Sequence, residues 1–373
     1  MRNPFNYLQF AKGDQFYERR EILSDLKSRF LSGQTNVVIY GPRRYGKSSL
    51  VAELAEQLEE EGFICISFDM VKMATITLFA EAYATKVYRR LAPVRLGVRQ
   101  ITDFFKNLRP RLTIGADGDT SFAFDSAMSE IGAEELSELL DLPQRLSGGK
   151  RVLIVMDEFQ EVEALLPNCG FERVMRSVIQ THRNVSYVFL GSRYHLLRRM
   201  FTDHGRPFYK SALTMLLDKP PLEESVAFVI SRFESAGITI SQEAAHRLVG
   251  KIANIPYYIQ QLGFETFRFA DEAGHSEATS SDVDAAYARL SGFNRNQYEQ
   301  AMLSFSTAQK KLLIALAHEN TDEFDAKYRQ KFDLGASSTV NSSKKKLIED
   351  GYVEQVEGAC QISDPFFAEY LRT

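Results

Sequence analysis

"GPRRYGKSSL", residues 41–50, is the stretch that decides which fold this sequence predicts. An apolar, β-branched run (36–40) precedes it, and a segment with helical periodicity continues from Ser48 to Gly62. A strand, a glycine-bearing loop and a helix in this order bind phosphate, because the loop turns its N–H groups inward and the helix adds its positive end. The stretch therefore predicts a phosphate-binding loop on a parallel sheet.

Each position in this loop has an expected contribution to nucleotide binding. Gly41 and Gly46 allow the turn, Lys47 reaches the β- and γ-phosphates, and the Ser48 hydroxyl binds Mg²⁺. The predicted cofactor-binding residues of the loop are Gly41, Pro42, Arg43, Arg44, Tyr45, Gly46, Lys47, Ser48 and Ser49. The pattern alone arises by chance in roughly one chain in a hundred of this length, so a second motif has to support it.

The second motif is a pair of carboxylates at the end of a buried strand. Residues 151–156 (RVLIVM) lead into Asp157 and Glu158, and the carboxyl end of a parallel strand meets the phosphate loop at one edge of the sheet. We assign Asp157 to the metal, directly or through water, and Glu158 to polarising the attacking water. The alternative is a solvated loop after a strand. Adjacent Asp and Glu favour hydrolysis over transfer to a small acceptor, which argues against a small-molecule kinase.

A third strand ends in polar residues that complete the predicted catalytic set. Residues 185–190 (VSYVFL) lead into Gly191, Ser192 and Arg193. Ser192 and Arg193 are candidate sensors of the γ-phosphate, beside Lys47 and Glu158. The alternative is that Ser192 caps the following helix and Arg193 is solvated.

Composition bounds the class of protein. The chain has 373 residues, of which 44% are apolar, which is enough for two or three domains with buried cores. The net charge of -4 gives no global bias toward nucleic acid. Three scattered cysteines (Cys65, Cys169 and Cys360) argue against a disulfide framework and a zinc site. The longest apolar run is too short to span a bilayer, so we expect a cytoplasmic protein.

The predicted fold class is α/β, with a doubly wound parallel sheet of five strands. Three of these strands are the runs at 36–40, 151–156 and 185–190, and residues 64–70 and 211–217 are predicted to form the other two. The predicted domains are a core with the phosphate loop (1–220), a helical domain (221–300) and a winged-helix domain (301–373). The family resemblance described below implies that the first is an ATPase core and the second its lid.

Residues 93–150 are interpreted as an insertion in the ATPase core. Within it, 111–124 is predicted as a hairpin turning at Asp117-Gly118, and 134–146 as a helix broken near Pro143.

The last segment has the order of a winged helix. Helices are predicted over 307–319, 323–333 and 337–350, followed by a hairpin that turns at Glu357-Gly358. Polar and basic side chains on the third helix suit phosphates and base edges, and these are Ser337, Ser338, Thr339, Asn341, Ser342, Lys344, Lys345 and Lys346. Residues 307–373 nevertheless hold nine Lys and Arg against eleven Asp and Glu, unlike a dedicated DNA binder. An intramolecular or protein–protein role for the winged helix is therefore the other prediction.

Taken in order, these motifs resemble the archaeal-ATPase-like group of the STAND branch of AAA+ ATPases. The resemblance covers nearly the whole chain and is carried by FYERRE (16–21), GPRRYGKSSL (41–50), VMDEFQEV (155–162), NVSYVFLGSR (184–193), RPFYKSA (206–212), IPYYIQQL (255–262) and QISDPFFAEYLR (361–372). It implies ATP with Mg²⁺ as cofactors. It also implies that Pro256 lies against adenine and that Phe16 and Arg19 lie near the base.

The predicted function is a molecular switch that binds and hydrolyses ATP and couples the nucleotide state to the lid and the winged helix. One alternative is an ATP-controlled DNA-binding protein similar to replication-initiator ATPases. Another is a scaffold, in stress or defence signalling, that binds nucleotide without turnover. Arg176, Arg193 and Arg206 are candidate arginine fingers.

Arg43 and Arg44 fill loop positions that are usually small. At the top of such a loop the N–H groups cradle phosphate and the side chains point outward. We therefore expect the two arginines to anchor a neighbouring element, with Asp364 or an acidic lid residue as the partner. The alternative is two solvated arginines.

Overall fold

The computed structural model describes residues 2–8, 13, 16, 19–92, 111–114, 120–124, 131–165, 170–319, 321–356 and 359–373. The chain forms two compact units. The sheet unit comprises 19–41 and 47–217, and the helical unit comprises 1–18, 42–46 and 218–373. The top of the phosphate loop is thus grouped with the helical unit, while the residues on either side of it belong to the sheet unit.

A five-stranded parallel sheet is the centre of the sheet unit, as predicted. Its strands are β1 (Asn36–Tyr40), β2 (Ile64–Asp69), β5 (Val152–Asp157), β6 (Val185–Gly191) and β7 (Leu213–Leu216). They lie in the order β2-β5-β6-β1-β7, and every neighbouring pair is parallel. The strands that carry the predicted site motifs, β5, β6 and β1, are therefore adjacent.

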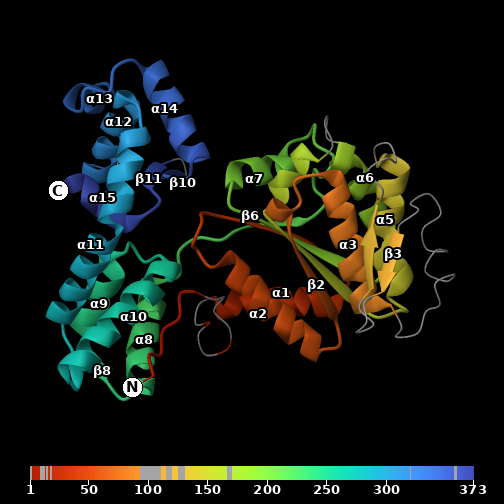
Figure 1. Cartoon of the computed structure of the whole chain (residues 1–373), viewed down its shortest axis with the longest axis horizontal. Helices are drawn as coiled ribbons and strands as arrows, with labels where there is room; N and C mark the ends of the chain where they lie inside the picture. The colour runs from red at the N-terminus through yellow and green to blue at the C-terminus, as the bar shows by residue number, and fades with distance from the viewer. Residues whose placement is uncertain are drawn as a thin grey trace. The chain divides into compact units, whose positions relative to one another are not determined.

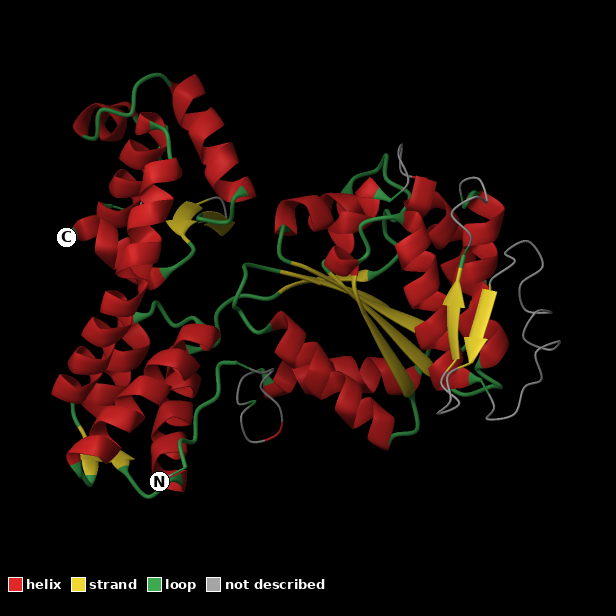
Figure 2. Ribbon diagram, viewed as in Figure 1, coloured by secondary structure: helices red, strands yellow, loops and turns green. Residues whose placement is uncertain are grey.

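Helices cover both faces of this sheet (Figures 1 and 2). One face carries α1 (Arg20–Ser32) and α2 (Lys47–Glu60), and the other carries α3 (Ile76–Leu91), α5 (Ala133–Leu146), α6 (Gly170–Ile179) and α7 (Tyr194–Thr202). Short 3₁₀ turns, η2 (Met70–Lys72) and η3 (Phe159–Ala164), follow β2 and β5. Because both faces are covered, the central strands are mostly apolar and buried, and all seven residues of β6 are buried.

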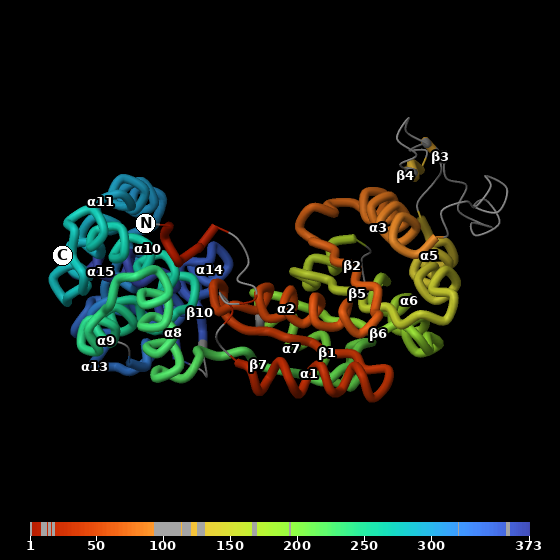
Figure 3. Tube along the Cα trace, turned by 90° about the horizontal axis from the view of Figure 1, so that it is seen from below, coloured from red at the N-terminus to blue at the C-terminus, as the bar shows by residue number. Residues whose placement is uncertain are grey.

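The predicted insertion contains an antiparallel hairpin. Strands β3 (Arg111–Ile114) and β4 (Thr120–Ala123) pair with each other and lie beside α3 (Figure 3). The Phe122 N–H donates to Thr85 Oγ1 at 3.1 Å, and the Phe122 ring meets Tyr88 edge-on with centroids 5.3 Å apart. The predicted turn at Asp117-Gly118 lies outside the described residues.

The predicted break at Pro143 is wrong, because α5 continues through this residue to Leu146. A proline inside a helix removes one hydrogen bond and costs about 3 kcal/mol. Pro143 stands in the last turn, and α5 buries a stripe of leucines along its length: Leu136, Leu139, Leu140, Leu142 and Leu146. Burial of this stripe outweighs the local preference against proline.

The residues predicted to form the lid fold as a helical bundle within the helical unit. Its elements are α8 (Leu222–Ser235), β8 (Thr239–Ile240), α9 (Gln242–Lys251), α10 (Pro256–Ala273), β9 (Glu277–Ala278) and α11 (Ser280–Ser304). The N-terminal segment packs on this bundle through Phe5, whose ring lies so close to Gly263 that an added Cβ there would meet it at 2.6 Å. The domain limits at 220 and 300 stay predictions, and α11 runs through the second of them.

The winged-helix order at the end of the chain is confirmed. Its elements are α12 (Thr307–His318), α13 (Ala326–Lys331), α14 (Ser337–Glu349), β10 (Val353–Val356), β11 (Ala359–Ile362) and α15 (Pro365–Arg372). Strands β10 and β11 pair antiparallel, and the predicted turn at Glu357-Gly358 lies outside the described residues. Throughout the described part of the chain, none of the helices combines the length and the apolar character that a membrane crossing requires.

Candidate nucleotide-binding site

The foot of the phosphate loop, by which we mean Gly41, Lys47 and Ser48, is tightly packed. A Cβ added at Gly41 would lie 2.4 Å from the Leu217 carbonyl oxygen, so only glycine fits there. Lys47 is buried, and its Nζ donates to the Gly41 carbonyl at 2.8 Å. The lysine ammonium therefore lies across the mouth of the loop, where the motif predicts phosphate contact.

Ser48 and Asp157 meet in the sheet unit, as the motif positions predict. The Ser48 hydroxyl donates to Asp157 Oδ2 at 3.0 Å, and Asp157 Oδ1 accepts the Glu158 N–H at 2.9 Å. Burial raises the pKa of Asp157, and the Ser48 hydrogen bond partly opposes that rise.

These two side chains fit a magnesium site of the nucleotide type. Mg²⁺ in such sites is held by one or two protein oxygens, with phosphate and water completing the octahedron. Among the described residues, there is no group of three or more His, Cys, Asp or Glu that could hold a metal alone. A hydroxyl and a carboxylate 3.0 Å apart are thus suited to a metal that arrives with the nucleotide.

The Glu158 carboxylate is held by groups at the ends of two adjacent strands. Its Oε2 accepts the Ser192 N–H at 3.1 Å, the Ser192 hydroxyl at 3.0 Å and the Gln160 side-chain amide at 2.5 Å. Glu158 itself has a left-handed backbone, with φ of 53°. The predicted carboxylate and the predicted sensor serine are therefore in direct contact.

Gln160 is the residue of this site that sequence reasoning gave no role. It is 4% exposed, and Gly191 leaves space for it, because an added Cβ there would come within 2.1 Å of Gln160 Oε1. The turn after Glu158 also contains Glu161 and Glu163, so nothing in the sequence singled out Gln160.

Two candidate arginines of the sheet unit pair with carboxylates. Arg193 Nη1 lies 3.5 Å from Glu161 Oε1. Arg206 pairs with Glu163 and with the buried Glu172. The third candidate finger, Arg176, lies on α6.

The residues expected near the base are all buried. Phe16 and Pro256 belong to the helical unit, where Pro256 opens α10, and Arg19 belongs to the sheet unit. Their contact with adenine stays a prediction.

Residues 42–46, which we call the crown of the loop, have partners in the helical unit. Arg44 Nη1 lies 3.6 Å from Asp364 Oδ2, so Arg44 has the acidic partner that the sequence suggested. Arg43 is exposed and reaches Gly351, where an added Cβ would meet its guanidinium at 3.1 Å.

The predicted DNA-contacting face of α14 is only partly exposed. Ser337, Asn341 and Lys345 are exposed, but Lys344 turns inward and its Nζ lies 2.5 Å from the buried Glu323 carboxylate. Lys346 pairs with Asp350 at 3.0 Å. Including Lys344 among phosphate-contacting residues is therefore wrong, because its charge is neutralised inside the domain.

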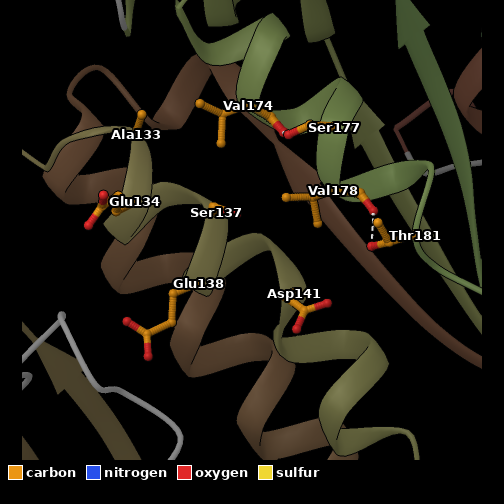
Figure 4. Close-up of a pocket in the computed structure, with 9 residues that line it drawn as sticks. All are labelled: Ala133, Glu134, Ser137, Glu138, Asp141, Val174, Ser177, Val178 and Thr181. Atoms are coloured by element: carbon orange, nitrogen blue, oxygen red, sulfur yellow. Dashed lines mark hydrogen bonds between the residues drawn. The ribbon is translucent and has the colours of Figure 1, made fainter.

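An open cleft of about 800 Å³ lies between α5 and α6 (Figure 4). Carboxylates Glu134, Glu138 and Asp141 line it together with Val174 and Val178. None of its nine lining residues belongs to the predicted nucleotide site, so this cleft is a separate feature of the sheet unit.

Comparison with known proteins agrees with the geometry. Residues 15–176 match the family model described as an AAA ATPase domain, and residues 296–373 match that of a probable winged helix domain. No curated protein sequence matches the chain.

Solved structures share the fold over nearly the whole chain. A Walker-type ATPase of Pyrococcus abyssi superposes with a TM-score of 0.66 and 18% identity, covering 99% of this chain and 100% of that one. The Aeropyrum pernix ORC1 protein in complex with DNA gives a TM-score of 0.54 and 15% identity, covering 99% of this chain and 96% of that one. The ORC2 protein of the same organism gives 0.57 and 13%, covering 99% and 95%.

At these identities the similarity shows the fold, and the narrower resemblance to the STAND branch stays a prediction. The matched segments, the sheet order and the loop geometry lead to one conclusion: the chain has the fold of an AAA P-loop ATPase, followed by a C-terminal winged-helix domain.

Proposed function

We propose that this protein binds ATP with Mg²⁺ at the phosphate loop, hydrolyses it, and acts as a molecular switch. The observation that carries the proposal is the convergence of Ser48, Asp157, Glu158 and Ser192 at the carboxyl ends of adjacent strands β1, β5 and β6. A loop that only bound phosphate would not need a carboxylate held beside the metal-binding pair.

In this proposal the loop N–H groups and Lys47 hold the phosphates, while Ser48 and Asp157 hold the metal. Bound Mg²⁺ would neutralise charge that develops on the phosphates during hydrolysis. Three hydrogen bonds fix the Glu158 carboxylate through Oε2, so Oε1 is the oxygen that accepts the proton from water. Ser192 and Gln160 then orient the base.

Two substitutions test the site. Lys47→Ala should weaken ATP binding by about 10- to 100-fold, because a charge-assisted contact contributes about 1.5 to 3 kcal/mol. Glu158→Gln should keep ATP binding and lose about 100-fold or more in turnover, because it removes a general base. Calorimetric titration and phosphate release measure the two effects. Glu134→Gln, which alters an exposed carboxylate of the separate cleft on α5, is the control.

The same pair of variants separates a switch from a scaffold. If wild type bound ATP but released no phosphate, and Glu158→Gln changed nothing measurable, the protein would be a nucleotide-dependent scaffold. If Lys47→Ala bound ATP as well as wild type, the site itself would be misassigned.

DNA binding is a second candidate function, favoured by the exposed polar residues Ser337, Asn341 and Lys345 on α14. The similarity in fold to the ORC1 protein, whose structure contains DNA, supports testing it. Lys345→Glu should weaken salt-sensitive binding in a gel shift, and its control is Lys331→Glu on α13. Absence of salt-sensitive binding, with and without ATP, would contradict this candidate.

A further inference from the structure

Arg44 is held by an ion pair and aromatic rings of the helical unit. Its guanidinium pairs with Asp364 and contacts the Tyr258 hydroxyl, and it lies over the rings of Tyr257 and Tyr258 at 5.3 and 4.9 Å. Asp364 is fixed independently of Arg44. Its Oδ1 caps α15 through the Phe366 N–H at 2.9 Å, and its Oδ2 accepts the Tyr298 hydroxyl at 3.2 Å.

The backbone at Arg44 is held as firmly as the side chain. Arg44 has φ of 68°, in the left-handed region that non-glycine residues rarely adopt. The Arg44 carbonyl accepts the Tyr257 N–H at 3.3 Å, at the start of α10. Helical-unit groups therefore set the conformation of the peptide units whose N–H groups a nucleotide would use.

Tyr45 is held by the winged-helix hairpin. Its ring is fully buried, and its hydroxyl donates to Glu354 Oε1 at 3.1 Å and accepts from Gln361 Nε2 at 3.0 Å. Glu354 on β10 and Gln361 on β11 are opposite each other in the hairpin, and Gln361 Nε2 donates a hydrogen bond to Glu354 Oε1 at 2.6 Å. The β10–β11 hairpin near the end of the chain thus holds Tyr45, the residue before Gly46 of the loop, by hydrogen bonds.

We propose that Asp364, acting through Arg44, and the Glu354–Gln361 pair, acting through Tyr45, are positioning residues of the nucleotide site. They hold the crown in the conformation that presents its N–H groups to phosphate. By linkage, nucleotide binding must favour these contacts as much as they favour nucleotide. This inference rests on the proposed ATP site and adds that the winged helix is part of its support.

The test is a double-mutant cycle on the full chain. Asp364→Asn keeps a capping side chain on α15 but removes the charge that faces Arg44, and Arg44→Gln removes the other charge. Affinity for a non-hydrolysable ATP analogue with Mg²⁺ is measured by calorimetry for wild type, both single variants and the double variant. We expect each single variant to lose about 5-fold in affinity, the lower end of typical coupling, because Arg44 is partly exposed. The double variant should lose little more than either one.

Asp325→Asn is the matched control, because Asp325 caps α13 in the same domain through the Tyr328 N–H. It should leave nucleotide affinity unchanged. If Asp364→Asn bound the analogue as tightly as wild type, or if the effects of the two substitutions were additive, the positioning role would be refuted.

The result separates this inference from the proposed function. Loss of analogue binding in Lys47→Ala together with wild-type binding in Asp364→Asn would overturn the positioning role alone. Wild-type binding in Lys47→Ala would overturn the ATP site, and the positioning role with it.

Discussion

The foot and the crown of the phosphate loop find their partners in different ways. The foot residues Lys47 and Ser48 contact Gly41 and Asp157 within the sheet unit, where strand order brings the groups together. The crown residues Arg44 and Tyr45 contact side chains of the helical unit from the far end of the sequence. The contacts of the foot thus stay within the sheet unit, while the crown makes the shape of the loop depend on residues from the far end of the sequence.

The largest effect should come from Asp157, the hydrogen-bond partner of the foot residue Ser48. Asp157→Asn keeps an acceptor for Ser48 but removes the charge expected to hold the metal, so turnover should fall by about 100-fold with little change in melting temperature. Phosphate release against Mg²⁺ concentration measures it. The control is Asp69→Asn, since Asp69 is the register partner of Asp157 on β2. Equal losses in both variants would mean that the effect is not specific to the metal ligand.

Substitution of Gly41 by alanine should lower the free energy of unfolding more than the same substitution at Gly33. Gly41→Ala forces a Cβ to within 2.4 Å of a backbone oxygen, and overpacking of this kind costs about 1 to 3 kcal/mol in unfolding free energy. Gly33→Ala is the control, because nothing lies within 4 Å of the added Cβ. Denaturant unfolding measures the free energy of unfolding of both variants. Equal values for Gly41→Ala and Gly33→Ala would contradict the close packing at the foot.

At the crown, Tyr45→Phe should cost about 1 kcal/mol in unfolding free energy, the usual contribution of a buried hydrogen bond. Tyr328→Phe, which removes the bond from a buried tyrosine to the Glu319 carbonyl, should cost about as much. Only Tyr45→Phe should also weaken binding of the ATP analogue. A loss of affinity in both variants would indicate general damage to the domain.

The smallest effect concerns pH. Burial raises the pKa of Asp364 above its usual 3.8, and Arg44 opposes that rise. The folded state therefore holds this proton more tightly than the unfolded state, so stability from Asp364 is lost as pH rises through the acidic range above 3.8. Arg44→Gln should raise the pKa of Asp364 further and extend this loss to higher pH, and Asp364→Asn should abolish it. Unfolding free energy measured against pH checks the sign.

The foot could be predicted from sequence because its partners follow from strand order. Once 36–40, 151–156 and 185–190 are identified as parallel strands, their carboxyl ends must share an edge, and Ser48, Asp157 and Glu158 come with them. The hydrogen bonds from Ser192 and Gln160 to Glu158 were not predicted, because they depend on side-chain directions rather than on strand order.

The errors have a common physical cause, which is that tertiary packing overrides local preference. Pro143 is tolerated because α5 buries its leucine stripe. Lys344 belongs to a run of lysines that suggests a solvated or phosphate-binding face, yet Glu323 draws it inward from 21 positions away. Asp364 was named as a partner of Arg44 from charge and position, whereas the contacts of Tyr45 with the hairpin had no sequence signal.

The crown contacts also affect how the chain folds during synthesis. Tyr45 and Gln361 are 316 positions apart, so at typical translation rates roughly 15 to 60 seconds separate their appearance. The sheet unit is complete at residue 217, long before the hairpin exists. A nascent chain therefore carries the foot of the loop before the side chains that hold its crown have been made. The hydrogen bonds of Tyr45 to the hairpin form only after the last strand has emerged from the ribosome.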